Sequence, residues 1–185
     1  MYFINKLLEL SQTENELREP VLKKFDVINM LNSLVKFNEQ LYKGKEVRWN
    51  VNIESNLKNT VTSDEEIIKT ILQNIIEVII KSIDMGDVSV DLSLATEELL
   101  IEKGINKDDS YLLFDISSNS LLLSESDLES MFDPYKIVDT PNRKNLLRAI
   151  MLACVKNLVQ TLNGHVWVKS QILKNTSFNI LIPQN

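Results

Sequence analysis

The chain has 185 residues, of which 44% are hydrophobic and 25% are charged, and this balance is typical of one globular domain with a single core. It contains one cysteine and one histidine, which excludes an internal disulfide and a zinc site built from nitrogen and sulfur ligands. The net charge is −6 and no apolar run approaches about 18 residues, so we expect a cytoplasmic protein without nucleic-acid or membrane contacts.

The N-terminal segment is expected to form an amphipathic helix from Phe3 to Leu17. Its apolar residues recur at steps of three and four, with one gap at Glu14. They are Phe3, Leu7, Leu10 and Leu17. The stripe covers only two heptads, so a short arm resembling a coiled coil and a helix folded onto its own domain both stay open.

Pro20 separates this segment from a second helix, which is expected over Phe25 to Tyr42 with Asp26 in its first turn. An acidic residue at that place complements the helix dipole. Apolar and polar residues then alternate from Val47 to Ile53. This alternation predicts a strand with one apolar face.

A third helix is expected over Ile67 to Ile83, after a cap at Ser63 or Asp64, and its isoleucines at helical spacing predict that it is buried. The remaining chain predicts two strands, a polar surface loop with a short helix, a long apolar helix and a final pair of strands. These segments are Val88 to Leu94, Tyr111 to Ser117, Ser120 to Arg143, Leu146 to Leu162, Val166 to Gln171 and Phe178 to Ile182.

Helices and strands alternate early in the chain, and two strands form a hairpin at its end. This order predicts an α/β fold, a two-layer sandwich of helices on a mixed sheet, preceded by an N-terminal helix.

Six segments, taken in order, share the pattern of one known family. They are residues 25–64, TILQNIIEVIIKS (70–82), LFDIS (113–117), LESMFDPY (128–135), LLRAIMLACVKNLVQTLNGHVWVKS (146–170) and SFNILIP (177–183). They resemble the catalytic, ATP-binding domain of sensor histidine kinases, whose GHKL or Bergerat fold is shared with DNA gyrase, heat-shock chaperones and mismatch-repair ATPases. The resemblance implies a mainly antiparallel sheet. It also divides the chain into residues 1–20, a helical arm resembling the end of a dimerisation hairpin, and residues 21–185, the histidine-kinase-like ATPase domain.

The resemblance places the family's asparagine box on the third helix, at Asn74, Val78 and Lys81. In the family, two asparagines and a lysine at this spacing face Mg²⁺ and the phosphates. Val78 replaces the second asparagine, and an isopropyl group cannot coordinate a cation that takes oxygen ligands. Asn74 and Lys81 are therefore either vestigial contacts for ATP and Mg²⁺ or ordinary polar residues at the exposed edge of a buried helix.

The family's first glycine box reads Asp-x-Gly-x-Gly and is matched here to the segment from Asp115 to Asn119. Asp115 is kept, so the resemblance makes it a candidate acceptor for the adenine amino group, with a solvated residue at a strand end as the alternative. Ser117 and Asn119 replace the glycines. Glycine allows close backbone approach or positive φ, which costs other residues roughly 1–2 kcal/mol.

The second glycine box corresponds to residues 149–152, near the start of the last helix. The helical pattern begins earlier, at Leu146, so we expect these backbone amides to be engaged in the helix and Met151 to occupy the place of a phosphate. Asn175 replaces the third glycine. The whole chain has four glycines, about 2% of its residues against the usual 7% or so. The shortage predicts a nucleotide pocket that has filled.

Two functions follow from the resemblance. The first is a two-component or phosphorelay signalling module, a pseudokinase that has lost nucleotide binding and acts by protein–protein interaction without a cofactor. The alternative is a functional ATP-binding domain of a larger sensor histidine kinase, which would use ATP and Mg²⁺. A phosphotransferase with a degenerate ATP domain and an anti-sigma-type kinase also stay open. No catalytic residue or metal ligand is predicted, and His165 is expected to be structural.

The expected partner is a signalling protein such as a kinase or a response regulator, and a homodimer through the N-terminal helix is a further expectation. The candidate contact residues lie on that helix and in the loop after the strand at 111–117, where we expect exposed side chains. They are Phe3, Leu7, Leu10, Met131, Phe132 and Tyr135.

Overall fold

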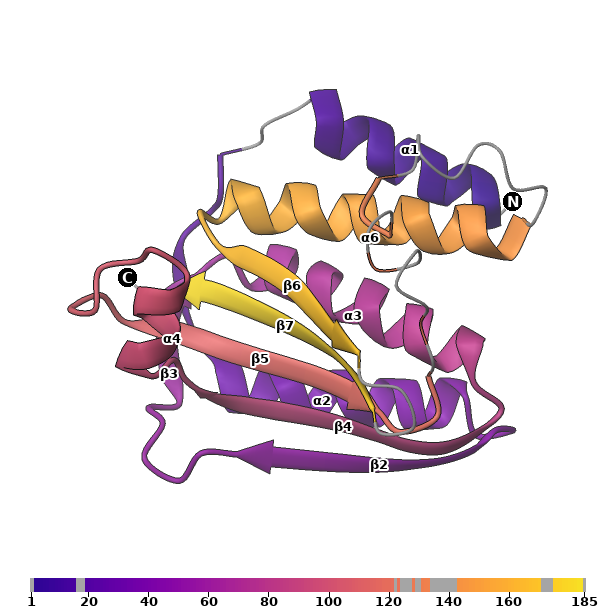
Figure 1. Ribbon diagram of the computed structural model, residues 1–185, viewed down its shortest axis with the longest axis horizontal. Coiled ribbons are helices and arrows are strands. Elements are labelled where there is room, and N and C mark those ends of the chain that lie inside the picture. The colour runs from indigo at the N-terminus through magenta and orange to yellow at the C-terminus, as the bar shows by residue number, and fades with distance from the viewer. Residues whose placement is uncertain are drawn as a thin grey trace.

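The computed structural model describes residues 2–15, 19–121, 123, 128, 131–133, 143–170 and 175–184. Figure 1 labels the elements along the chain. They are α1 (Tyr2–Asn15), β1 (Lys23–Asp26), α2 (Val27–Leu41), β2 (Glu46–Ile53), β3 (Thr60–Ser63), α3 (Glu65–Ser82), β4 (Met85–Leu94), α4 (Glu97–Glu102), β5 (Tyr111–Ser118), α6 (Arg143–Thr161), β6 (His165–Ser170) and β7 (Thr176–Pro183).

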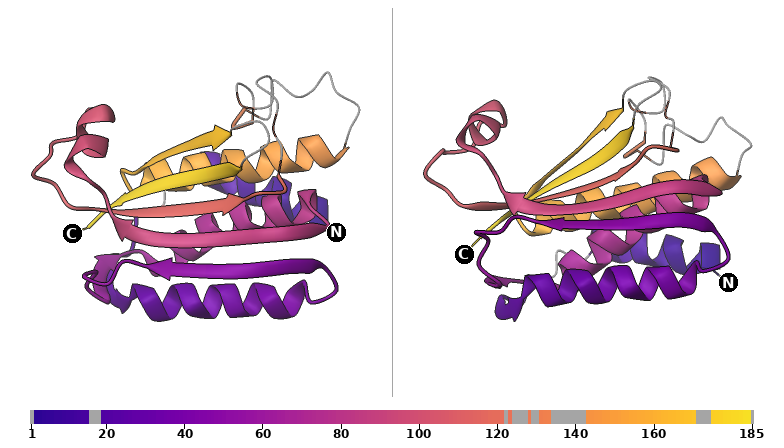
Figure 2. Two further views of the ribbon diagram at one scale, coloured as in Figure 1. Left: turned by 60° about the horizontal axis from the view of Figure 1, so that its bottom comes forward. Right: turned by 90° about the horizontal axis from the view of Figure 1, so that it is seen from below.

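Five strands form one sheet in the order β2-β4-β5-β7-β6. β2 runs parallel to β4, and the other neighbouring pairs are antiparallel. The helices α2, α3 and α6 cover one face of this sheet, and Figure 2 shows the two layers from the side. The predicted two-layer α/β sandwich with a mixed, mainly antiparallel sheet is confirmed.

The main core lies between the sheet and these helices, and α3 contributes most to it. Asp64 caps α3, because its carboxylate accepts hydrogen bonds from the backbone N–H groups of Glu66 and Ile67, both at 3.1 Å. Six of the isoleucines of α3 are almost fully buried, which confirms the predicted buried helix. They are Ile68, Ile71, Ile75, Ile76, Ile79 and Ile80.

α1 packs on α6 and stays outside the main core (Figure 1). Leu10 is 7% exposed, and together with Phe3 it meets a small apolar cluster on α6. Of the two alternatives left open by the sequence, the structure therefore has a helix folded onto its own domain.

Three short elements are absent from the sequence prediction: β1, β3 and α4. β1 and β3 pair with each other in a separate two-stranded sheet, with Phe25 opposite Val61. Phe25 therefore belongs to a strand and not to the second helix. Asp26 is the N-cap of α2 rather than a residue of its first turn, since its carboxylate accepts from Asn29 N at 2.8 Å.

The last helix ends as expected at Asn163 and Gly164, but the two residues act differently. Asn163 takes the left-handed conformation, with φ of 54°, which asparagine tolerates better than most residues. A Cβ on Gly164 would overlap with the backbone oxygen of Leu181 on β7. This glycine is needed for close approach of the helix end to the sheet.

Candidate functional site

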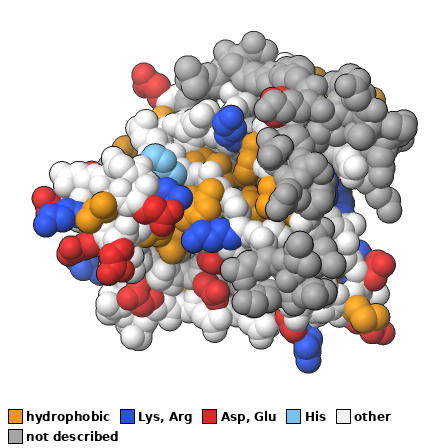
Figure 3. Space-filling model, viewed as in Figure 1, with side chains coloured by type: hydrophobic (Ala, Val, Ile, Leu, Met, Phe, Trp, Pro, Cys, Tyr) orange, Lys and Arg blue, Asp and Glu red, His pale blue; other side chains and the backbone are white. Residues whose placement is uncertain are grey.

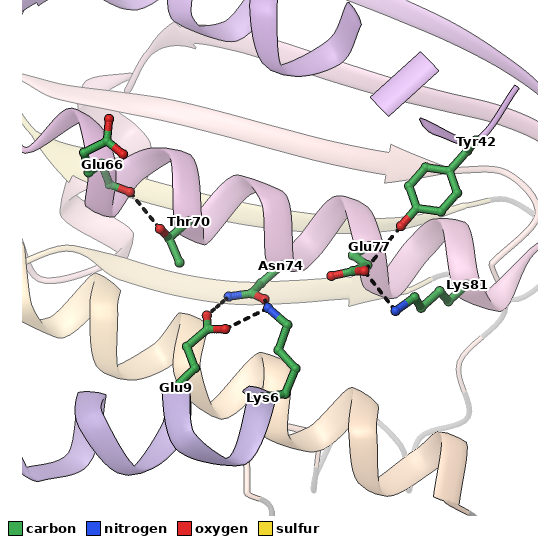
Figure 4. A network of polar contacts seen from close by, with 8 residues as sticks. All are labelled: Lys6, Glu9, Tyr42, Glu66, Thr70, Asn74, Glu77 and Lys81. Carbon is green, nitrogen blue, oxygen red and sulfur yellow. Dashed lines mark hydrogen bonds and ion pairs between the residues drawn. The ribbon is translucent and has the colours of Figure 1, made fainter. Parts of the chain in front are cut away.

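The asparagine-box residues lie on the side of α3 that faces α1 and α6. Asn74 is 1% exposed and Val78 3%, so the expectation that Asn74 sits at an exposed edge is wrong. Asn74 Nδ2 donates to Glu9 Oε1 at 2.8 Å, and Lys6 Nζ donates to Asn74 Oδ1 at 2.6 Å. Figure 4 shows both side chains of α1 reaching the amide. The retained asparagine is thus bound by the chain's own first helix.

Lys81 is held by a carboxylate one turn before it on α3. Its Nζ lies 2.9 Å from Glu77 Oε1, which also accepts a hydrogen bond of 3.3 Å from the Tyr42 hydroxyl (Figure 4). Burial and the neighbouring Glu77 raise the pKa of Tyr42 to about 12. Tyr42 therefore stays protonated and can keep donating to Glu77 at neutral pH.

The N-terminal part of α6 closes the region where the family uses bare glycine amides. α6 begins at Arg143, six residues ahead of Ala149, so the amide N–H groups of residues 149–152 fall inside the helix and can bond to the preceding turn. These four side chains are 0–1% exposed. The expectation that the helix starts before the box is confirmed.

A cavity of about 370 Å³ remains between α3 and α6. Val78, Leu147 and Met151 give it an apolar wall, and Lys81 and Arg148 add two cationic side chains. Val78 and Met151 thus line one cavity, at the positions where the family's pattern has an asparagine and a glycine.

Asp115 lies on the other face of the sheet. Its neighbours on β5, Phe114 and Ile116, are fully buried in the core beneath α3, so the intervening side chain points away from the helices. Asp115 Oδ2 instead accepts a 3.3 Å hydrogen bond from Ser177 of β7. The structure brings Asn74 and Lys81 onto one helix but separates Asp115 from both, and an adenine contact is not compatible with this orientation.

The surroundings of Asp115 disfavour its charged form. Desolvation by burial and the carboxylate of Asp91, its partner residue on β4, raise the pKa of Asp115 to about 6. Its Oδ1 atom is buried and has no hydrogen-bond partner. Figure 3 looks onto this open face of the sheet, where apolar side chains lie among acidic and basic ones.

The strand-end residue that faces the helices is Ser118, which the sequence analysis missed. It is the last residue of β5 and is 2% exposed. Its hydroxyl accepts a hydrogen bond of 3.2 Å from Ser120 N. The alternation along β5 could have predicted this, because every second residue of a strand faces the same side. Leu112, Phe114 and Ile116 face the core, and Ser118 is the next residue in that series.

The expected contact residues are mostly not exposed. Met131 is 1% exposed and Phe132 is half-buried against the core, so the predicted exposure of both is wrong. Phe3 and Leu10 face α6, which leaves Leu7, 42% exposed, as the accessible member of the α1 set. Tyr135 lies outside the described residues.

Across the described ranges, the acidic, histidine and cysteine side chains do not gather into any group that could hold a metal ion. His165 is exposed at the start of β6. Within those same ranges, no helix has the length and apolar character needed to cross a bilayer.

Comparison with known proteins places these features in a family. The profile described as "Histidine kinase-, DNA gyrase B-, and HSP90-like ATPase" matches residues 63–185. The chain is 26% identical over 181 residues to the Autoinducer 2 sensor kinase/phosphatase LuxQ of Vibrio vulnificus (strain CMCP6), covering 97% of the chain and 20% of that protein. It is 22% identical over 184 residues to the sensor protein RprX of Bacteroides fragilis (strain YCH46), covering 97% of the chain and 33% of that protein.

Solved structures share the fold. The Acinetobacter baumannii histidine kinase AdeS aligns with a TM-score of 0.72 and 16% identity over 98% of this chain and 77% of that one. Full-length ShkA, solved with AMPPNP, aligns with a TM-score of 0.79 and 17% identity over 99% of this chain and 35% of that one. The chain spans only a fifth of LuxQ and a third of RprX, and it belongs to the histidine kinase-, DNA gyrase B- and HSP90-like ATPase family.

Proposed function

We propose that this chain is a histidine-kinase-like signalling domain that no longer binds nucleotide and acts by contacting other proteins. The observation that carries the proposal is the start of α6 at Arg143. A helix N-terminus binds phosphate through N–H groups that have no partner within the helix. At residues 149–152 those groups lie inside α6, and the side chain of Met151 lines the cavity beside them.

The Mg²⁺ contacts of the family are also replaced. Val78 offers no oxygen ligand, and the amide of Asn74 is already bonded at both ends to Glu9 and Lys6. A cation at this place would have to compete with the ammonium group of Lys6, which lies 2.6 Å from the amide oxygen. The side chains present therefore favour an internal contact over metal binding.

The adenine contact is weakened for a different reason. Asp115 points away from the helices, and the position that faces them carries the hydroxyl of Ser118. A carboxylate accepts hydrogen bonds roughly twice as strong as those of a neutral group. A serine at this position supports at most a weaker hold on an adenine amino group.

The alternative function, an ATP-binding catalytic domain of a larger sensor kinase, is favoured by one observation. The cavity between α3 and α6 has about 370 Å³ and carries both Lys81 and Arg148, and its volume lies within the range of about 300–1,000 Å³ usual for small-molecule sites. Two cationic side chains suit a phosphate group. If nucleotide binds at all, this cavity is where it would bind.

A partner-binding role is supported by the outer face of α1. Ile4, Leu7 and Leu8 are 59%, 42% and 58% exposed, and they are spaced so that they share one side of the helix. We expect this ridge to contact a second copy of the chain or another signalling protein such as a kinase or a response regulator.

Melting curves with and without Mg²⁺-ATP test the nucleotide part of the proposal. A ligand at 100 times its Kd stabilises a protein by about 2.7 kcal/mol, which for this size raises the melting temperature by roughly 5–10 °C. The wild type should show no such increase at millimolar nucleotide.

The matched variant restores the family's groups for the cation and the phosphates, but not the one for the base, by combining Val78→Asn, Ala149→Gly and Met151→Gly. If it folds, as judged by its circular dichroism spectrum, it should gain a response to Mg²⁺-ATP that the wild type lacks. A 5 °C increase for the wild type itself would support the alternative function.

A further inference from the structure

α1 is attached to the rest of the protein through α6 and through polar contacts with α3, outside the main core. Its apolar contacts form a cluster separate from the main core, so the core of the sheet and the other helices is complete without it. The cluster consists of Phe3, Leu10, Leu146, Ile150, Ala153 and Cys154. Helices that contribute little to the main core are the elements that open first in native proteins.

A polar triad joins the same helix to α3 (Figure 4). Lys6 Nζ donates to Glu9 Oε2 at 2.8 Å and to Asn74 Oδ1 at 2.6 Å, and Asn74 Nδ2 donates to Glu9 Oε1 at 2.8 Å. Each member contacts the other two, so the ring closes only when α1 sits in one register on α3. Charge-assisted hydrogen bonds of this kind are stronger than neutral ones and select a single arrangement.

Two surface pockets border the triad, and Glu9 lines both of them. One of about 370 Å³ is lined by Glu9, Thr13 and Thr70, and one of about 510 Å³ by Lys6, Phe37 and Asn74, among others. α1 is thus not sealed against α3. Water can reach the polar groups of the triad when the helix moves away, which lowers the cost of separating them.

From these contacts we infer that α1 is a latch. It opens from α6 and α3 as a unit while the rest of the domain stays folded, and the Lys6–Glu9–Asn74 triad holds the closed state. The closed latch covers the apolar strip of α6 and the Asn74 amide, and the open latch presents both. This inference is independent of whether nucleotide binds.

Cys154 provides a direct readout of the latch. It is the single cysteine of the chain, is 0% exposed and lies beneath α1. A thiol reagent can modify it only when the covering helix moves, and when reclosing is fast the labelling rate follows the population of the open state. The tryptophans, Trp49 on β2 and Trp167 on β6, report whether the sheet is still folded.

The experiment compares labelling of Cys154 in the wild type and in Lys6→Met under native conditions. Lys6→Met keeps the length of the side chain but removes two hydrogen bonds of the triad. It should increase the labelling rate about tenfold, while the tryptophan fluorescence stays native. The matched control is Lys69→Met on α3, which removes ion pairs of 2.8 and 3.2 Å to Glu65 and Glu66 and should leave the rate unchanged.

Two results would overturn the inference. The first is labelling that proceeds only in step with loss of the tryptophan signal, which would mean that Cys154 is uncovered by global unfolding. The second is an equal labelling rate in Lys6→Met and the wild type, which would mean that the triad does not hold α1.

Discussion

In the function that we propose, three side chains, Val78, Met151 and Ser118, each replace a different part of the family's nucleotide site. Val78 offers no oxygen ligand, Met151 puts a side chain inside α6 where the family has a glycine, and Ser118 puts a neutral hydroxyl on the core face at the end of β5. Their effects do not overlap, because one concerns the cation, one the phosphates and one the base. Restoring any one of them alone therefore leaves two contacts missing.

Asp115 does not face the helices, where an adenine contact was expected, and its environment makes its charged form destabilising. Its pKa of about 6 lies above the ordinary value of 3.8, so the folded state binds this proton more tightly than the unfolded state does. Its contribution to stability is therefore fully present below about pH 4 and is lost as the pH rises to about 6. At neutral pH the folded state holds an unfavourable charge beside Asp91.

Asp115→Asn should stabilise the protein at pH 7 by about 1–2 kcal/mol, which is less than the full conversion of the pKa change because solvent screens this partly exposed carboxyl. At pH 4 the variant and the wild type should have the same stability within error. Urea unfolding at the two pH values measures both differences. Asp108→Asn, at an exposed residue in the turn before β5, is the control and should change neither. A variant of Asp115 that is less stable than the wild type at pH 7 would contradict this account.

Among the elements, α3 carries both the core and the remaining site residues. Its position is set at its first turn, where Asp64 is 3% exposed. The carboxylate accepts from two N–H groups of the helix and, through Oδ2, from Val21 N at 2.8 Å. One side chain thus fixes the start of α3 and ties the segment before β1 to it.

Asp64→Ala should lower the free energy of unfolding by about 2–3 kcal/mol, because the cap is lost and the N–H groups that it bonded stay buried. Asp64→Asn keeps one acceptor oxygen for the helix but turns its NH2 group toward Val21 N, so it should cost about 1 kcal/mol, less than Asp64→Ala. Thr96→Ala removes the cap of the exposed helix α4 and is the matched control for a cap outside the core. Chemical denaturation followed by circular dichroism separates the three variants. An equal decrease in the free energy of unfolding for Asp64→Ala and Thr96→Ala would show that the buried Asp64 cap stabilises the protein no more than an exposed cap does.

The long elements of the fold follow from sequence pattern, and the short ones do not. α3 has strong helical periodicity, α6 is a long and largely apolar run closed by Asn163 and Gly164, and β2 alternates without interruption, so each was predictable within a few residues. β1 and β3 have four residues each and exist because they pair across the chain, with Lys23 opposite Ser63. Segments this short do not carry a period that can be read without knowledge of their partner.

The same limit applies to the site. The positions of Val78 and Met151 in the site followed from the resemblance. The alternation along β5 could have predicted that Ser118 faces the helices. The contact of Lys6 with Asn74 could not, because 68 residues separate them and nothing local to either segment specifies the other. Contacts between α1 and α3 depend on how whole elements pack.

At the scale of the whole molecule, the assembly that we propose depends on the outer face of α1. If the Ile4, Leu7 and Leu8 ridge forms the contact between two copies, Ile4→Glu together with Leu8→Glu should convert a dimer to a monomer, since charged groups are disfavoured at the centre of an interface. Ile101→Glu, at a position on α4 that is 62% exposed, should leave the mass unchanged. Multi-angle light scattering gives the masses. A monomeric wild type would rule out the homodimer and leave the ridge to another signalling protein.

We propose that this domain of an ATPase family does not bind nucleotide. Calorimetric titration of Mg²⁺-ATP into the wild-type protein tests it most directly. We predict no saturable heat up to about 1 mM nucleotide, the concentration range of a binding free energy near −4 kcal/mol. Saturable binding of one nucleotide per chain with a Kd below about 1 mM, abolished by Lys81→Met in the cavity between α3 and α6, would contradict the account.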